Sequence, residues 1–326
     1  MGKLLCGPPS STLPDPFHSL SPVPHLPSSA AVDWESVDGL DDQQRRSLSQ
    51  LSSRGVLWKH PSDPSISATF RLFHGGDVQA DGNCLFSAAR IAMGLSLSKV
   101  SARDLRRRTV GRFEADLVSG VIARAGVDEA VRHLYSPDLR TGWGVHVVQE
   151  VKLLARKVER EELDAAISEL VDLGLQRESA AESIYKERGI AVDDGPSWVK
   201  FMSVSGSADD EYDIITLQYT EDGLLAVDEN TEGRAAAFGD DIAVESLATE
   251  FGREIFVVQA HGSDAMIEED SCLFFLPHCP RGQISEPPAF LLMKGRGWCG
   301  AGADHYEPLI SFPAPNTSQE KAAIVL

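Results

Sequence analysis

The chain has 326 residues, of which 42% are hydrophobic, so it can bury a sizeable core in one large domain or two small ones. Its 30 Lys and Arg against 49 Asp and Glu give a net charge of −19. This charge argues against nucleic acid or an anionic membrane as the main partner, because both attract cationic surfaces. It is consistent with plain solubility or with a basic protein partner. No apolar run approaches the ~20 residues that a membrane span requires.

The cysteines indicate a reducing compartment. They are scattered and odd in number: Cys6, Cys84, Cys272, Cys279 and Cys299. Such a set does not build a disulfide framework, so we expect a cytoplasmic protein, with the nucleus as the alternative. The last three cysteines and His278 could be drawn as a zinc site. The C-x2-C spacing of such sites is absent, so we expect neither a metal nor another cofactor.

A Pro- and Ser-rich composition marks the N-terminal part of the chain. Residues 1–32 have few large apolar side chains, which is typical of disorder. A short helix with three leucines is indicated over residues 38–53. We therefore expect a largely disordered arm over residues 1–55, with regular structure from Val56 onward.

A strand and three helices come next in the sequence. The strand covers residues 68–73, and a polar turn then leads to an apolar helix that begins at Cys84. Ser101-Ala102-Arg103-Asp104 is a capping box for a second helix, which runs to about Val118. A further short helix is indicated over residues 127–135.

Residues 146–189 predict helix throughout. Two apolar stripes with helical spacing support this: Val147, Val151, Leu154 and Val158, then Leu163, Ile167, Leu170 and Val171. Gly174 and Gly189 are plausible helix ends. The stretch from Leu170 to Gly174, followed by Ala180-Ala181, resembles a ubiquitin-associated module. Only two helices are available for it, so we favour an ordinary helical insertion.

Residues 205–241 are acidic. They hold eleven Asp or Glu and one basic residue, Arg234, which accounts for −10 of the net charge of −19. Two apolar runs around Thr220-Glu221-Asp222-Gly223 predict a β-hairpin over residues 212–227. An inserted acidic hairpin could touch a basic partner, and a solvated surface insertion is the alternative that we favour.

The C-terminal part shows an α/β pattern. An amphipathic helix over residues 241–251 is followed by three strands and a Gly-rich loop over residues 294–304. A last strand begins near His305. The three strands cover residues 254–259, 272–276 and 289–293.

Cys84 carries the chemistry that this sequence indicates. The turn Asp81-Gly82-Asn83 delivers it to the first turn of a helix, whose positive dipole end favours the nucleophilic thiolate. Gly82 permits a turn that a side chain would obstruct, and the N–H groups of the turn, including Asn83, and of Cys84 could hold an oxyanion. Asp81 can fix the loop or help polarise the site. The alternative is an ordinary turn beside a buried cysteine.

His305 is the candidate base. It lies at the junction of a Gly-rich loop and a strand, where a side chain can point into a cleft. An imidazole can hold the thiol proton and later pass it to the leaving amine. Its other ring nitrogen needs an orienting acceptor. Glu307 shares a strand face with His305 and Asp81 comes from the nucleophile turn, so we expect one of these two carboxylates in that role.

Three motifs in one order resemble the ovarian tumour (OTU) class of cysteine proteases. They are Asp81-Gly82-Asn83-Cys84-Leu85-Phe86, the helix-then-strand unit from Gly239 to Val258, and His305-Tyr306-Glu307-Pro308-Leu309. The resemblance spans roughly residues 70–312. It implies isopeptide hydrolysis of ubiquitin conjugates, with Cys84 as nucleophile, His305 as base and Asp81 as the acid before the nucleophile. The family usually places Asn or Asp where this chain has Glu307, which is one methylene longer.

The resemblance also implies an architecture and partners. We expect a papain-like α/β fold, with a small central sheet flanked by helices, over residues 56–312. Residues 146–189 and 205–238 would be insertions, and residues 313–326 a C-terminal tail. The partners would be ubiquitin or polyubiquitin chains, and the protein a monomer. The alternatives are a catalytically weak or inactive ubiquitin-binding scaffold and a cysteine hydrolase for another ubiquitin-like modifier.

Overall fold

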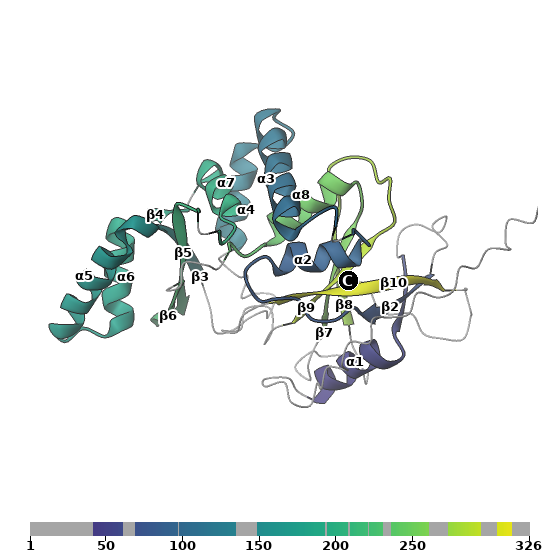
Figure 1. Ribbon diagram of the computed structural model, residues 1–326, viewed down its shortest axis with the longest axis horizontal. Helices are drawn as coiled ribbons and strands as arrows, with labels where there is room; N and C mark the ends of the chain where they lie inside the picture. The colour runs from purple at the N-terminus through teal and green to yellow at the C-terminus, as the bar shows by residue number, and fades with distance from the viewer. Residues whose placement is uncertain are drawn as a thin grey trace, which may run out of the picture.

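The computed structural model describes residues 42–60, 69–96, 98–134, 149–192, 194–207, 209–220, 222–230, 236–260, 273–294 and 305–314. These residues form a mixed α/β structure with two sheets (Figure 1). The helices are α1 (Asp42–Ser53), α2 (Cys84–Ala92), α3 (Ala102–Val118), α4 (Arg124–Leu134), α5 (Arg160–Asp172), α6 (Arg177–Arg188), α7 (Gly195–Ser203) and α8 (Asp241–Phe251). The strands are β1 (Val56–Lys59), β2 (Thr69–His74), β3 (Gln149–Arg156), β4 (Ile190–Ala191), β5 (Tyr212–Thr220), β6 (Gly223–Glu229), β7 (Ile255–Ala260), β8 (Leu273–His278), β9 (Ala289–Lys294) and β10 (His305–Ala314).

The first sheet, in the order β1-β2-β10-β9-β7-β8, is the centre of what we call the main lobe. Only β7 and β9 are parallel; the other neighbours are antiparallel. Helices α2, α3 and α8 pack over one face, and α7 packs against α3 and α4 (Figure 1). Buried side chains of α2 and α3, such as Leu85, Phe86 and Phe113, fill the space between these helices and the sheet. Full burial of each stabilises the fold by about 1.5–3 kcal/mol.

Helix α1 covers the opposite face of this sheet. Leu48 and Leu51 are buried there against a second core that includes Trp58, Phe256 and Phe290. The helix predicted near residues 38–53 is therefore present, and it belongs to the folded body rather than to the N-terminal arm. Of the arm, residues 1–41 lie outside the described part of the chain, as do residues 315–326 of the tail.

The second sheet, in the order β4-β3-β5-β6, is antiparallel and forms what we call the accessory lobe together with α5 and α6. It has its own core, in which Leu163, Ile167 and Tyr185 of the helices meet Ile215 and Leu217 of the sheet. In Figure 1 these two helices form the end of the molecule that lies farthest from α1. The predicted acidic hairpin is present as β5 and β6.

The prediction of helix throughout residues 146–189 is wrong at its N-terminal end. Residues 149–156 form strand β3, which pairs with β5 along its whole length. The helical spacing of valines and leucines coincides there with an alternation of period two: Leu153 and Ala155 face the accessory core, and Leu154 faces the main core. The partner strand lies more than fifty residues later in the sequence, so local spacing could not decide between the two periods.

Most local predictions in the main lobe are confirmed. The capping box of α3 is complete, since the Ser101 hydroxyl accepts from the Asp104 N–H and the Asp104 carboxylate accepts from the Ser101 N–H. Helix α8 ends at Gly252, which has a positive φ of 57°. The strands predicted near residues 254–259, 272–276 and 289–293 appear as β7, β8 and β9. The Gly-rich loop over residues 295–304 lies outside the described residues.

Candidate active site

The nucleophile turn needs a glycine at position 82. Gly82 has φ +76°, a conformation that side chains disfavour. A Cβ atom there would lie 2.0 Å from the carbonyl oxygen of Ala236. The turn is held against this segment, because the Ala236 N–H donates to the Asp81 carbonyl oxygen over 2.9 Å. Gly82 therefore allows both the turn and its close approach to a second backbone segment.

Asp81 and Asn83 fix the turn from within. Asp81 Oδ1 accepts from the Asn83 N–H over 2.9 Å, and Asn83 Nδ2 donates to the carbonyl oxygen of Ser205 over 3.1 Å. Asp81 thus does what the sequence allowed for it, which is to fix the loop. The Asn83 amide was expected to contribute to an oxyanion pocket, but in this conformation it is already bonded to Asp81.

Arg106 is the residue at this site that sequence reasoning missed. The residue is 3% exposed, yet within the described part of the chain its guanidinium donates only to neutral oxygens. These are Asn83 Oδ1 (2.8 Å) and the carbonyl oxygens of Met202 (3.2 Å), Gly82 (2.7 Å) and Ala237 (2.5 Å). One side chain therefore ties the nucleophile turn to two other backbone segments. Burial lowers the pKa of Arg106 to about 10, so it remains a cation at neutral pH.

The sequence does carry a signal for this arginine. Arg106, Thr109, Val110 and Phe113 follow the i, i+3, i+4, i+7 spacing of a buried helix face. A charged residue on such a face is unusual, because burying a charge is costly unless it is well bonded. Its guanidinium also lies 4.5 Å from the ring centre of Phe86, a cation–π contact.

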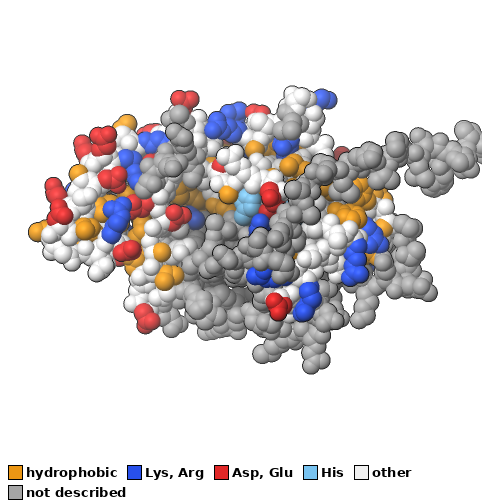
Figure 2. Space-filling view, turned by 60° about the horizontal axis from the view of Figure 1, so that its bottom comes forward, with side chains coloured by type: hydrophobic (Ala, Val, Ile, Leu, Met, Phe, Trp, Pro, Cys, Tyr) orange, Lys and Arg blue, Asp and Glu red, His pale blue; other side chains and the backbone are white. Residues whose placement is uncertain are grey.

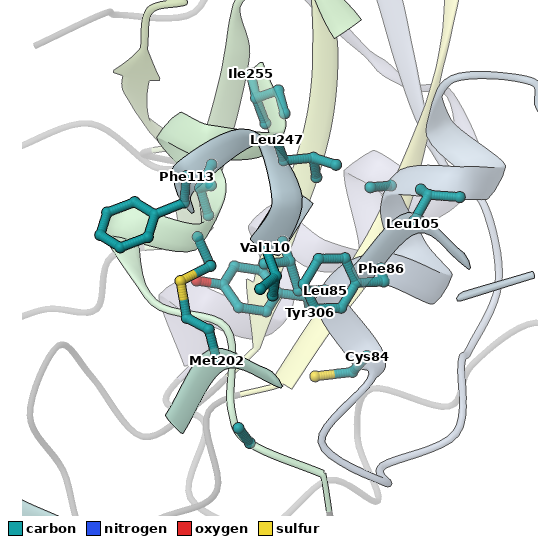
Figure 3. Packing of buried hydrophobic residues seen from close by; sticks show 14 of the residues in the cluster. Cys84, Leu85, Phe86, Leu105, Val110, Phe113, Met202, Leu247, Ile255 and Tyr306 are labelled. Carbon is teal, nitrogen blue, oxygen red and sulfur yellow. The ribbon is translucent and has the colours of Figure 1, made fainter. Parts of the chain in front are cut away.

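Cys84 lies where β10 lacks a neighbouring strand on one edge. Strand β9 pairs with His305–Leu309, whereas β2 pairs with β10 only from Leu309 onward. The start of α2 fills the remaining edge, and the sulfur of Cys84 accepts hydrogen bonds from the N–H groups of Tyr306 and Leu85. Figure 3 shows Leu85 and Phe86 inside the hydrophobic cluster and the Cys84 sulfur at its margin. The sulfur is thereby hydrogen-bonded to the backbone N–H of Tyr306, the residue that directly follows His305.

The Cys84 thiol is buried in this conformation, with 2% of the residue exposed. Burial raises the pKa of Cys84 above its ordinary value of 9.0, and the charge of Asp81 acts in the same direction. The two amide donors and the positive charge of Arg106 oppose this effect without cancelling it. The expectation of a thiolate at the helix start therefore does not hold for this conformation, in which desolvation outweighs the donors at the helix terminus.

His305 is oriented by a backbone oxygen. Its Nε2 lies 3.1 Å from the carbonyl oxygen of Val78. A carbonyl oxygen can only accept, so we assign the proton of the neutral ring to Nε2, which leaves Nδ1 with the lone pair. Among the described residues, neither Glu307 nor Asp81 is hydrogen-bonded to His305, although we expected one of them to orient it. The carbonyl of Val78 takes the place of that carboxylate.

Glu307 has other partners. It is 1% exposed and lies 2.6 Å from His74 Nε2 and 3.2 Å from Lys294 Nζ. Burial alone would raise the pKa of Glu307, but the hydrogen bonds and charges of His74 and Lys294 hold it below its usual range. The ligand atoms of His74, Glu307 and the exposed Asp77 lie within 4.8 Å of one another. The ammonium group of Lys294 lies beside Glu307 and balances its charge, so the Lys294–Glu307 ion pair accounts for a carboxylate buried in this cluster.

The structure thus brings Asp81, Gly82, Asn83, Cys84 and the start of β10 together from segments more than 200 residues apart.

No protein family, curated protein or solved structure matches the chain in sequence or fold. Within the described residues, no helix combines the length and apolar character that crossing a bilayer would require.

Proposed function

We propose that the protein is a thiol-dependent hydrolase of the OTU type that cleaves isopeptide bonds of ubiquitin conjugates. The observation that carries this proposal is the position of Cys84. Its sulfur is hydrogen-bonded to the amide of the residue after His305 and lies near the buried cation Arg106. The carbonyl oxygen of Val78 keeps the proton of His305 on Nε2. A cysteine nucleophile and an adjacent imidazole base are the components that acyl transfer by a cysteine uses, and a nearby positive charge favours the thiolate. The mixed α/β fold and the order of the three motifs are consistent with this class.

The residues suggest the following sequence of steps. Nδ1 of His305 takes the thiol proton, and the Cys84 thiolate attacks the carbonyl carbon of the isopeptide bond. The N–H groups of Gly82 and Cys84 donate to the oxyanion that forms. The imidazolium passes its proton to the leaving lysine amine, and a thioester remains on Cys84. Water then attacks the thioester with His305 as base, which releases a carboxylate and restores the thiol.

Arg106 supports the first step. Because it donates only to neutral oxygens, its charge is free to favour a thiolate nearby. The raised pKa of Cys84 implies that the imidazole must remove the proton during the reaction, since no thiolate is stored at rest.

A ubiquitin probe with a C-terminal electrophile tests the proposal. We expect one covalent adduct on the reduced wild-type protein and none on Cys84→Ser, which is nearly isosteric. Cys279→Ser is the matched control, because Cys279 is free and exposed, and it should react like wild type. Absence of an adduct on the wild type, or an adduct that survives Cys84→Ser, would overturn the proposal. An adduct only with a probe built on another modifier would reassign the substrate.

One observation favours a second candidate, a ubiquitin-binding scaffold without turnover. Cys84 is buried, and Glu307, at the position of the third catalytic residue in the OTU class, is bonded to His74 and Lys294. This candidate predicts that the wild-type protein binds ubiquitin but forms no adduct with the probe.

A further inference from the structure

The turn between α5 and α6 exposes apolar side chains. Val171, Leu173 and Leu175 are all exposed, and Leu173 is 78% exposed. No other five-residue stretch of the described chain has three exposed large apolar residues. We call these three residues the α5–α6 tip. Figure 2 shows apolar side chains among acidic ones at the end of the molecule that α5 and α6 occupy. Exposed apolar side chains that lie together are a feature of interaction surfaces.

Hydrogen bonds close the backbone of the tip. The Leu175 N–H donates to the carbonyl oxygen of Leu170 over 3.1 Å, and the Gly174 N–H donates to that of Val171 over 2.9 Å. Together with the φ of +99° at Gly174, this is the Schellman motif that ends many helices. Ile167 and Leu163, one and two turns before Val171, are buried in the accessory core. The tip therefore carries its leucines on a backbone that hydrogen bonds already hold, which reduces the backbone entropy lost on binding.

Exposed acidic residues lie next to the tip residues in sequence and form what we call the acidic rim. Glu169, Asp172 and Glu178 are exposed, and none of them is in an ion pair among the described residues. The basic residue closest in sequence, Arg177, already pairs with Glu229 at 2.7 Å. Residues 149–229 as a whole contain 20 acidic and 8 basic side chains, a net charge of −12. The complementary surface is an apolar patch among Lys and Arg side chains.

Charge argues against self-association at this surface. A second copy of the chain would bring the same acidic rim and a net charge of −19. Residues 1–41 contain five acidic residues and one basic residue, Lys3, so they are also repelled by the rim. The occupant is therefore a different protein with a basic, partly apolar surface.

We propose that the α5–α6 tip docks a ubiquitin unit of a polyubiquitin chain, distinct from the unit whose C-terminus enters the active site. This inference rests on the proposed function, which supplies ubiquitin as the partner. The tip lies at the far end of the accessory lobe, away from α2 (Figure 1), so it cannot hold the reacting C-terminus. A second contact makes binding of the chain partly intramolecular and raises its affinity without touching the chemistry.

The test uses the double variant Leu173→Asp/Leu175→Asp in the full chain. Val158→Asp is the matched control, because Val158 is an apolar residue of the same lobe, 83% exposed and outside the tip. We expect the double variant to raise the KM for cleavage of a ubiquitin dimer or tetramer about tenfold, with kcat unchanged. In the non-reacting Cys84→Ala background it should weaken binding of the same chain about tenfold, while Val158→Asp stays within twofold of wild type in both assays.

A second readout separates this inference from the proposed function. The monoubiquitin electrophile engages only the active site, so the tip variant should react with it at the wild-type rate. If the wild type gives an adduct but the tip variant leaves chain KM and binding unchanged, the docking site is overturned and the proposed function stands. If the tip variant also loses the monoubiquitin adduct while circular dichroism shows it folded, the tip is not a separate site. If the wild-type protein forms no adduct, the proposed function is overturned, and the inference that rests on it is overturned too.

Discussion

The start of α2 and the end of α5 are built in opposite ways. At the start of α2 the Asn83 side-chain amide and the Arg106 guanidinium donate to carbonyl oxygens of residues up to 131 positions away. At the end of α5 the backbone closes on itself within six residues, and the side chains point to solvent. A reacting group needs long-range partners because its surroundings must be dry and fixed, whereas a docking turn needs only a local fold and a free surface.

Of the variants that test this comparison, Arg106→Met is expected to lower the free energy of unfolding most. The variant leaves three buried oxygens and one part-buried oxygen without this donor, so we expect the free energy of unfolding to fall by about 3 kcal/mol or more. Removing the cation also removes an effect that lowers the pKa of Cys84. The inflection in the rate of Cys84 alkylation against pH should therefore move to higher pH. Denaturant unfolding and iodoacetamide kinetics measure the two effects.

Arg106→Lys sharpens the same comparison. It keeps the charge but loses the planar fork, so most of the stability loss should remain while the pH profile of alkylation stays closer to that of wild type. Equal stability of wild type and Arg106→Met would show that the long-range hydrogen bonds do not hold the turn.

Gly82→Ala is expected to have the next largest effect. The new Cβ would meet the Ala236 backbone, and the positive φ would be strained, so the turn must move. We expect a loss of about 1–3 kcal/mol in stability and a fall in reactivity with the ubiquitin probe of at least tenfold. Gly174→Ala is the paired control at the tip: its φ is also positive, but no atom lies within 4 Å of its Cβ position. It should lose about 1 kcal/mol with normal reactivity.

Glu307→Gln tests the acid dependence of the main lobe. Because the folded-state pKa of Glu307 lies below the ordinary value of 4.5, its contribution to stability is present above that value and lost as pH falls through the folded-state pKa. We expect the variant to be less stable than wild type by about 1–3 kcal/mol at pH 7, with the difference shrinking below pH 4.5. Urea unfolding at several pH values measures it. A large fall in kcat with unchanged stability would instead assign Glu307 to orienting His305.

Leu173→Ala is the smallest expected effect. The side chain is exposed and its neighbours make their own hydrogen bonds, so the free energy of unfolding should change by less than about 0.5 kcal/mol. Leu163→Ala, in the accessory core beneath it, should cost about 2–5 kcal/mol by contrast. Similar losses for the two variants would mean that the tip is part of the core.

This difference also explains what the sequence could predict. The capping box at Ser101, the helix end at Gly174 and the glycine turn before Cys84 were predicted because each is decided by residues a few positions apart. The carbonyl of Val78 beside His305, the partners of Glu307 and the network of Arg106 were missed because each joins distant segments. Strand β3 was assigned to a helix for the same reason, since its ladder partner is far along the chain.

The network of Arg106 has a consequence for how the accessory lobe is attached. Between β4 and β5 the chain returns to the main lobe as α7, and the carbonyl oxygens of Met202 and Ser205 at the end of that helix bond to Arg106 and Asn83. The two segments of the accessory lobe, β3 to β4 and β5 to β6, therefore lie on either side of a helix that belongs to the main lobe. Deleting residues 149–229 as one stretch would remove α7 together with the accessory lobe, and with it two of the acceptors that hold the nucleophile turn.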